Sequence, residues 1–202
     1  LMVIVCGSAN SWIQDKLINN HGGLYNRITY EIKLSPFDLY ECEQFYKSNR
    51  VNMSQYDIVQ SYMIFGGIPF YMGYMDPGLS LAQNVDHLIF RKGAVLRGEY
   101  DRLFASVFVN PESVKKIVEL LSTRNAGYTR REILDKLKIA DGGRFSSNLN
   151  ALVSSDFIIR YVPFGAKKRE EHYKLVDPFC IFYIHFIKNA KKSNGKYWQQ
   201  YH

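Results

Sequence analysis

The chain has few of the residue patterns that mark a disulfide framework or a metal site. Its 202 residues include only three cysteines, Cys6, Cys42 and Cys180, which lie far apart without a Cys-x-x-Cys spacing. An odd number of isolated cysteines argues against both a disulfide framework and a zinc site. The five histidines have no metal-ligand spacing either. This cysteine usage is typical of a reducing cytoplasm, which is the location we expect.

The sequence also lacks a hydrophobic run that is long enough to cross a bilayer. The longest mostly apolar run, residues 179–187, is about half as long as a membrane-spanning helix needs to be. The N-terminus has no signal-peptide pattern. We therefore expect no membrane partner.

The net charge of +7 is unevenly distributed along the chain. Residues 1–107 carry 9 Lys/Arg against 10 Asp/Glu, whereas residues 108–202 carry 17 against 9. A basic domain favours an acidic partner, and nucleic acid is the first of these to consider. The alternative is a lysine-rich face that serves solubility alone.

The N-terminal part of the chain has the pattern of a parallel sheet followed by helices. Residues 1–6 form an apolar run that ends in a polar turn, and residues 27–34 are a second strand candidate. A parallel strand needs neighbours, so we expect residues 1–34 to end an α/β domain whose other strands precede them. Residues 35–107 are expected to be helical, with one helix from Phe37 and another from Ser80 that continues toward Phe104. Between them, Ser54 is expected to cap a helix that ends at Gly66-Gly67 and carries an apolar stripe formed by Tyr56, Val59, Tyr62 and Met63.

Residues 108–178 predict three short helices followed by a β-hairpin. Pro111 opens the first helix, and Thr129 and Glu132 form a capping box at the start of the second. The third carries Phe145 and Leu149 on its apolar face, and strands are expected at 157–162 and 171–176. This order predicts a winged helix-turn-helix domain. Residues 179–202 are expected to form a helical tail or linker, so the chain as a whole is α+β and mostly α.

Five segments, taken in order, resemble the prokaryotic and archaeal-type AAA+/STAND ATPases. The resemblance covers nearly the whole chain. It implies the end of a nucleoside-triphosphatase core, followed by a helical lid and a winged helix. The segments are Val5–Trp12, Gly23–Arg27, Pro36-Phe37, Gly66–Tyr71 and Tyr173–Phe179.

The resemblance implies a set of nucleotide-sensing residues. Ser8, with Asn10 and Ser11 as alternates, matches the polar residue that senses the γ-phosphate, at the end of a strand where such sheets bind ligands. Arg27 matches an arginine that touches phosphate or a neighbouring subunit. Gly67 and Pro69 match a Gly-x-Pro motif that packs against adenine and ribose. The alternatives are that Ser8 only caps a helix and that Arg27 is an exposed residue at the start of a strand.

Two of the family's motifs have no counterpart in the chain. There is no Gly-x-x-x-x-Gly-Lys-[Ser/Thr] loop (Walker A) and no apolar strand that ends in paired acids (Walker B). ATP and Mg²⁺ are therefore expected to be held by an N-terminal ATPase core outside this sequence, and neither is expected to bind tightly to this chain. We expect the parent protein to be an ATPase and this chain alone not to be an enzyme, with a role as a nucleotide-sensing lid and a winged-helix relay.

Two other functions stay open. In the first, the winged helix binds duplex DNA through Arg144, Ser147, Asn148 and Asn150 on its third helix and through Lys167, Lys168 and Arg169 in the wing. In the related ATPases, however, the winged helix often packs on the core and does not touch DNA. In the second, the chain is an adaptor that binds a protein partner or associates with itself.

Overall fold

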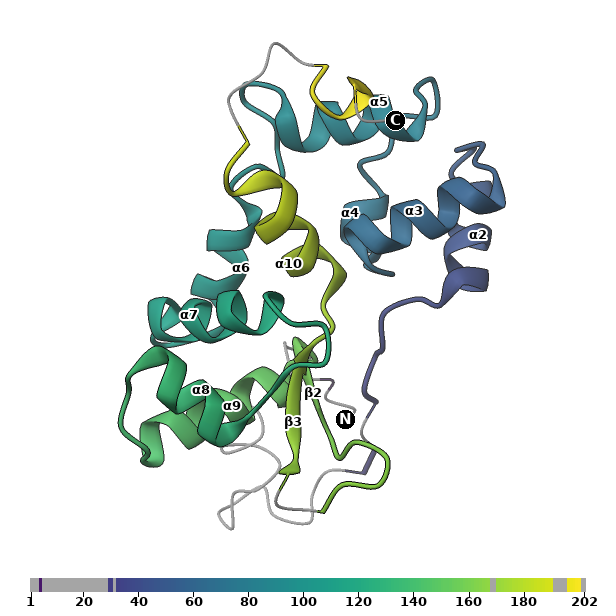
Figure 1. Ribbon diagram of the computed structural model, residues 1–202. Coiled ribbons are helices and arrows are strands. Elements are labelled where there is room, and N and C mark those ends of the chain that lie inside the picture. Colours follow the sequence, from purple (N-terminus) through teal and green to yellow (C-terminus); the bar gives the residue numbers. More distant parts are fainter. Residues whose placement is uncertain (1–3, 5–28, 31, 168–169, 191–195, 201–202) are drawn as a thin grey trace. The chain divides into compact units, whose positions relative to one another are not determined.

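The computed structural model describes residues 4, 29–30, 32–167, 170–190 and 196–200. The chain divides into two compact units, which are described separately (Figure 1). Unit 1 comprises Leu1–Lys33 and Leu103–Val176, and unit 2 comprises Leu34–Arg102 and Asp177–His202. Residues 179–202, expected to be a tail or linker, thus belong to the same unit as residues 34–102, together with Asp177 and Pro178, which were expected in the winged-helix domain.

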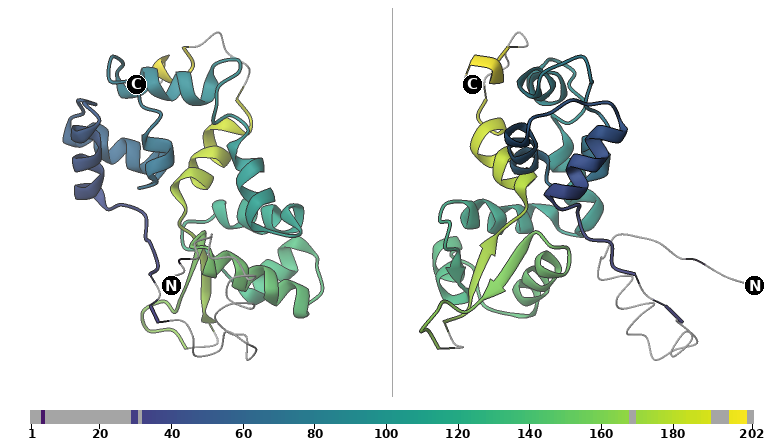
Figure 2. Two further views of the ribbon diagram at one scale, coloured as in Figure 1. Left: turned by 180° about the vertical axis from the view of Figure 1, so that it is seen from behind. Right: turned by 90° about the vertical axis from the view of Figure 1, so that its right-hand side faces the viewer.

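Unit 1 combines helices with a small antiparallel sheet. After α6 (Glu99–Val107), which begins in unit 2, its elements are α7 (Pro111–Ser122), β1 (Tyr128–Thr129), α8 (Arg130–Leu137), α9 (Gly143–Ser154), β2 (Ile158–Tyr161) and β3 (His172–Leu175). The strand order is β1-β3-β2, and both pairs are antiparallel. Tyr173 is the central residue, opposite Tyr128 on one side and Arg160 on the other. Figure 2 shows the β2–β3 hairpin from behind and from the side.

Local signals explain where the elements of unit 1 begin. Pro111 occupies the first turn of α7, where its missing N–H costs no helical hydrogen bond. Thr129 accepts a hydrogen bond from the backbone N–H of Glu132, and the Glu132 side chain in turn accepts one from the Thr129 N–H. The buried faces of the helices meet those of β2 and β3 in a single core, whose members include Val118, Leu149 and Leu175. The expected three helices and hairpin are thus present in the expected order, with β1 as an addition.

The regular elements in the described part of unit 2 are all helices, joined by turns and irregular segments. Its elements are α2 (Leu39–Ser48), α3 (Gln55–Phe65), α4 (Pro69–Met72), α5 (Leu81–Val85), the π-helix η2 (Asp86–Phe90), α10 (Pro178–Phe182), the π-helix η4 (Tyr183–Ile187) and the 3₁₀-helix η5 (Trp198–Gln200). Asp38, Ser54 and Ser80 each form a capping box at the start of α2, α3 and α5, so the expected cap at Ser54 is confirmed.

The predicted apolar stripe of α3 is wrong. Tyr56 is 71% exposed and Met63 is 66% exposed, whereas Ile58, Ile64 and Phe65 are buried. The opposite face of the helix packs, because α3 contacts α2 and α10 through that side. A buried hydrogen bond of 2.6 Å between the hydroxyls of Tyr46 and Ser61 joins α2 to α3 on the same side.

The helix expected from Ser80 is present as far as Phe90, through α5 and η2, but its expected continuation toward Phe104 is not. It is interrupted after Phe90, and α6 begins only at Glu99. Between them the backbone turns at Gly93, whose φ of +78° lies in the left-handed region that glycine adopts without strain. Arg97 Nη1 donates to the carbonyl oxygen of Phe90 at 3.0 Å and closes this turn.

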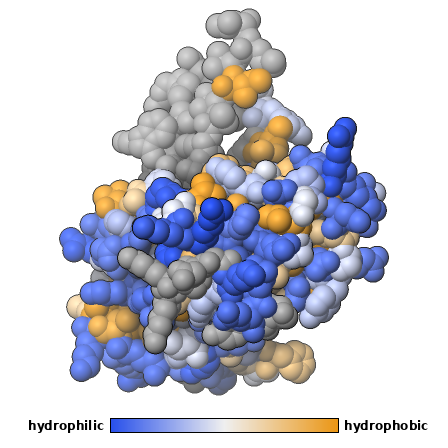
Figure 3. Space-filling model, turned by 90° about the horizontal axis from the view of Figure 1, so that it is seen from above, coloured by the Kyte–Doolittle hydropathy of each residue, from blue (hydrophilic) through white to orange (hydrophobic). Residues whose placement is uncertain are grey.

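The two strands expected in residues 1–34 lie mostly outside the described residues. The described positions in those ranges, residues 4, 29–30 and 32–34, are not in a strand. In the part of the chain that the structure describes, no helix has the length and apolar character to cross a membrane. On the face drawn in Figure 3, hydrophobic residues form small separate patches among hydrophilic ones.

Candidate functional site

Of the predicted nucleotide-sensing residues, Gly67 and Pro69 lie in the part of the chain that the structure describes. Ser8, Asn10 and Arg27 lie outside the described residues. Gly67 and Pro69 lie in the turn between α3 and α4, where Gly66 ends α3 with a φ of +63° and Pro69 opens α4. We call residues 66–70 the glycine-proline turn.

Gly67 has no room for a side chain. A Cβ atom there would overlap the carbonyl oxygen of Phe37 and lie 2.7 Å from its carbonyl carbon. The Phe37 N–H also donates to the Gly67 carbonyl oxygen at 2.7 Å. The close backbone approach that glycine permits is therefore made here by the chain's own residue 37.

The start of α10 packs against the same turn. A Cβ atom at Gly66 would lie 3.6 Å from Pro178 Cδ, in ordinary van der Waals contact. The ring of Phe179 stacks on that of Tyr71, with centroids 5.2 Å apart and planes inclined by 29°. Asp177 caps α10 by accepting a hydrogen bond of 2.7 Å from the Cys180 N–H.

Three segments of the five that carry the family resemblance therefore meet in unit 2. Pro36-Phe37, Gly66–Tyr71 and Asp177–Phe179 come together although more than 100 residues separate the first from the last. We call this contact region the motif junction, and it comprises Phe37, Gly66, Gly67, Tyr71, Pro178 and Phe179.

The phenol and thiol groups around the motif junction have raised pKa values, which favour their neutral forms. Burial, followed by the negative charge and hydrogen bond of Glu99, raises the pKa of Tyr71, whose hydroxyl donates to Glu99 Oε1 at 3.2 Å. Burial, assisted by Asp38 and Glu41, raises the pKa of the Cys42 thiol to about 11. Burial also raises the pKa of Cys180, with a further contribution from Asp177. Protonated thiols are poor nucleophiles, so this chemistry favours packing over covalent catalysis.

One side of the glycine-proline turn presents apolar surface. Pro69 is exposed, Phe70 is 58% exposed and Tyr74 is 40% exposed. The Phe70 and Tyr74 rings pack edge to face with centroids 5.2 Å apart. A flat ligand or an apolar partner could therefore contact this side without displacing the buried Gly67. Among the described residues, no group of acids, histidines and cysteines is arranged to hold a metal ion.

The predicted DNA-contacting residues that the structure describes lie on α9 and in the β2–β3 loop of unit 1. Arg144, Ser147 and Asn150 are exposed on α9, and Asn148 is half-buried. Among the described residues, none of these four side chains takes part in a hydrogen bond or an ion pair. Lys167 is exposed in the β2–β3 loop. Lys168 and Arg169 lie outside the described residues.

Arg130 joins α8 to α9 and was not predicted from the sequence. Its guanidinium pairs with Asp141, donates to Ser146 Oγ at 2.8 Å and lies over the Phe145 ring at 4.8 Å. The hydrogen bond to Asp141 is the main cause that raises the pKa of Arg130, and it correspondingly lowers that of Asp141. The sequence offered no signal for this pair, because 11 residues separate the partners.

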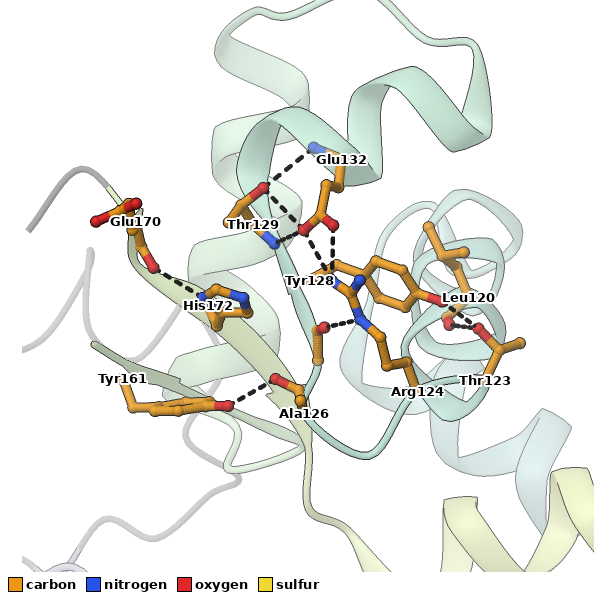
Figure 4. Close-up of polar contacts among 11 residues, drawn as sticks. Leu120, Thr123, Arg124, Ala126, Tyr128, Thr129, Glu132, Tyr161, Glu170 and His172 are labelled. Atoms are coloured by element: carbon orange, nitrogen blue, oxygen red, sulfur yellow. Dashed lines mark hydrogen bonds and ion pairs between the residues drawn. The ribbon is translucent and has the colours of Figure 1, made fainter. Parts of the chain in front are cut away.

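A second arginine positions the start of α8. Arg124 Nη2 donates to both carboxylate oxygens of Glu132, at 2.9 and 2.8 Å, and its Nε donates to the Gly127 carbonyl oxygen at 2.6 Å. Its guanidinium also lies 3.8 Å from the centroid of the Tyr128 ring. Figure 4 shows the Arg124 and Glu132 side chains pointing toward one another beside Thr129. The capping box was predicted, but the role of Arg124 was not.

The comparisons with known proteins give one distant relative. No protein-family model and no solved structure matches the chain. A protein of Methanocaldococcus jannaschii named "Uncharacterized protein MJECL04" is 27% identical over 187 residues. The match covers 92% of this chain but 40% of the relative, so the chain spans about two fifths of the length of the curated relative that it resembles.

Proposed function

We propose that the chain supplies the nucleotide-sensing lid and a winged-helix relay of an ATPase of the AAA+/STAND kind, without hydrolysing nucleotide itself. The observation that carries the proposal is the motif junction, where Phe37 contacts Gly67 and Phe179 stacks on Tyr71. The middle one of three segments that the family resemblance singled out, Gly66–Tyr71, packs with Phe37 on the one hand and with Pro178 and Phe179 on the other, as parts of one working unit would do.

The relay would run from the glycine-proline turn into unit 1 through α10. Nucleotide that packs against the exposed edges of Pro69 and Phe70 would press on a turn that has no free space at Gly67. The turn contacts Pro178, and only Val176 and Asp177 separate β3 from α10 along the chain. Closely packed elements do not deform continuously but switch between discrete arrangements. A displacement at one element can therefore be transmitted to the next.

The winged-helix part of the proposal is supported by element order and sheet topology. Unit 1 runs α7-β1-α8-α9-β2-β3 with the strand order β1-β3-β2. Three helices and an antiparallel hairpin in this order are what a winged helix requires. ATP and Mg²⁺ would be bound by a core outside this chain, with Ser8, Asn10 and Arg27 as the sensing residues on the core side.

The proposal is tested in the polypeptide encoded by the full reading frame. Hydrogen exchange of α10 and β3 is measured by mass spectrometry with and without ATP and Mg²⁺, in the wild type, in Pro69→Ala and in the control Pro77→Ala, which is also exposed in unit 2. ATP should slow exchange in the wild type and the control, and less so in Pro69→Ala. The absence of a phosphate-binding loop upstream of Leu1, or bound ATP with unchanged exchange, would contradict the proposal.

DNA binding is a second candidate function, favoured by the exposed polar face of α9. Arg144 and Asn150 are side-chain types that recognise guanine and adenine edges in the major groove. Affinity for duplex DNA should fall steeply with salt, and Arg144→Ala should weaken it by about 1–3 kcal/mol. Lys116→Ala, which removes an exposed charge from α7, is the matched control. Equal binding by both variants in a mobility-shift titration would exclude α9 as the contact.

A further inference from the structure

Phe164 is the most exposed large hydrophobic residue in the part of the chain that the structure describes. Its relative exposure is 109%, compared with 41% for the neighbouring Val162. It lies in the loop that joins β2 to β3. Leaving a phenylalanine ring in water forgoes the favourable free energy of burying it. An exposed position of this kind therefore suggests a binding role.

The backbone around Phe164 forms a defined turn. The Ala166 N–H donates to the Pro163 carbonyl oxygen at 3.0 Å, which closes a four-residue turn with Phe164 and Gly165 in the middle. Gly165 has a φ of +79°, as the third residue of a type II turn does. The turn holds the Phe164 ring outward, away from the core of unit 1.

The residues after the turn are also held by hydrogen bonds. The Lys167 N–H donates to Glu170 Oε2 at 2.7 Å, and the Glu170 N–H donates to the Lys167 carbonyl oxygen at 2.8 Å. These contacts use the backbone of Lys167 and leave its ammonium exposed. Within the described residues, that ammonium forms no ion pair. The apolar ring is therefore presented three residues from a solvated cation.

The charge of the surrounding unit favours a polyanionic occupant. Residues 103–176 contain 13 Lys/Arg and 8 Asp/Glu, a surplus of five positive charges. Arg160, on β2, is exposed like Lys167. The cores of protein–protein interfaces are depleted in charge, whereas minor-groove binding combines cations with an inserted apolar side chain such as Phe. A single exposed ring in a loop that also carries an exposed lysine matches the second pattern.

We propose that Phe164 is an apolar wedge that enters the minor groove of duplex DNA, with Lys167 against the adjoining phosphates. The proposal rests on DNA binding, the second candidate function, and names a contact beyond the α9 face. Insertion of such a ring between base steps partly unstacks them and kinks the duplex by about 20–90°. DNA bound by this chain should therefore be bent.

The test measures binding and bending separately. A duplex of about 20 bp, two helical turns, carries a donor and an acceptor fluorophore at its ends. It is titrated with the wild type, Phe164→Ala, Phe164→Trp and the control Val109→Ala, whose side chain is 95% exposed outside the hairpin. Circular dichroism checks that each variant is folded, which a substitution at a fully solvated position should not prevent.

The wild type, Phe164→Trp and Val109→Ala should bind and bend the duplex alike. Phe164→Ala should lose the bend and bind roughly five- to a hundredfold more weakly, as expected for the loss of one stacked aromatic contact. Binding with equal bending by Phe164→Ala and the wild type would overturn the wedge and leave DNA binding through α9 intact. Failure of the wild type to bind duplex DNA at any salt concentration would overturn both.

Discussion

At the scale of single residues, Gly67 shows how a motif position can serve the fold. The glycine of the Gly-x-Pro motif predicts that another group packs closely against the backbone at residue 67. In the structure, that group is the backbone of Phe37. Pro69, two residues later, remains exposed. Within the same short motif, one residue is thus buried against the backbone and the other is exposed.

Replacing Gly67 by alanine should destabilise unit 2. The added methyl group would overlap the Phe37 carbonyl, which is backbone and cannot rotate away, so the turn must shift. The free energy of unfolding should fall by about 1–3 kcal/mol, as in other overpacked sites. Urea denaturation followed by circular dichroism measures it. Gly98→Ala is the control, since a methyl group there meets only the flexible end of Arg102. Equal midpoints for both variants would contradict the steric argument.

Asp177 should make stability depend on pH. Burial raises the pKa of its carboxyl, against the opposing effect of the Cys180 N–H hydrogen bond. The folded state therefore holds the proton more tightly than the unfolded state does. This contribution to stability is fully present below the unfolded-state pKa of about 3.9 and is lost as pH rises through the raised folded value.

Asp177→Asn should remove this dependence, because asparagine caps a helix equally well and does not ionise. As pH rises from about 4 toward neutrality, the unfolding free energy of the variant should increase relative to that of the wild type. Asp38→Asn is the matched control, since Asp38 caps α2 from an exposed position. A difference between Asp177→Asn and the wild type that stays constant with pH would show that burial does not perturb this carboxyl.

At the scale of elements, α8 begins where several polar groups meet on one carboxylate. Glu132 accepts hydrogen bonds from the Thr129 N–H at 2.8 Å, the Thr129 hydroxyl at 3.0 Å and Arg124 Nη2 at 2.8 Å. Partial burial by itself would raise the pKa of Glu132, but these hydrogen bonds outweigh it and lower the pKa. The end of α7 and the start of α8 are thereby tied together (Figure 4).

Glu132→Gln should lower the stability of unit 1 by about 1–2 kcal/mol at neutral pH, since it weakens the cap and the pair with Arg124. A group with a lowered folded pKa contributes stability above its unfolded pKa, about 4.3, and loses it as pH falls through the folded value. The deficit should therefore shrink in acid, as measured by thermal unfolding across pH. Glu112→Gln, which breaks an exposed pair with Lys115, should change stability by less than about 0.5 kcal/mol. Equal effects of the two variants would contradict the assignment.

At the scale of the whole molecule, two units with separate cores share one chain. Unit 2 is completed by residues from the far end of the sequence. The carboxylate of Asp86, fully buried in η2, accepts hydrogen bonds from the Trp198 N–H at 2.6 Å and from Gln199 Nε2 at 2.9 Å. The Trp198 ring stacks on Phe90 with planes 5° apart. Residues 196–200 are thus part of the packing of unit 2.

Asp86→Asn should loosen unit 2 and leave unit 1 unchanged. The NH₂ group of an asparagine side chain would face donors in place of an acceptor, since residues 198 and 199 supply three donors to Asp86. Local stability should therefore fall by about 1–3 kcal/mol. Hydrogen exchange should accelerate in residues 81–90 and 196–200, and keep its rate in α7, α9 and β3. Asp135→Asn, at an exposed pair in unit 1, should alter neither region. Faster exchange throughout the chain would show that the two units unfold together.

The sequence by itself determined the features that arise within a few residues of one another. The caps at Ser54 and Thr129 and the order of three helices and a hairpin follow from hydrogen bonding and periodicity over single turns of the chain. The Gly-x-Pro motif could be recognised because its residues are adjacent in the sequence. Its packing partners, Phe37, Pro178 and Phe179, could not be predicted.

Only the tertiary structure decided which residues meet across long separations. The contacts of Tyr71 with Phe179 and of Asp86 with Trp198 each join residues more than 100 positions apart. Such pairs leave no periodic trace, because each depends on how several helices pack at once. The same reason accounts for α3: its sequence offers two apolar faces, and the neighbouring helices α2 and α10 decided that Ile58 and Phe65 are buried while Tyr56 and Met63 face solvent.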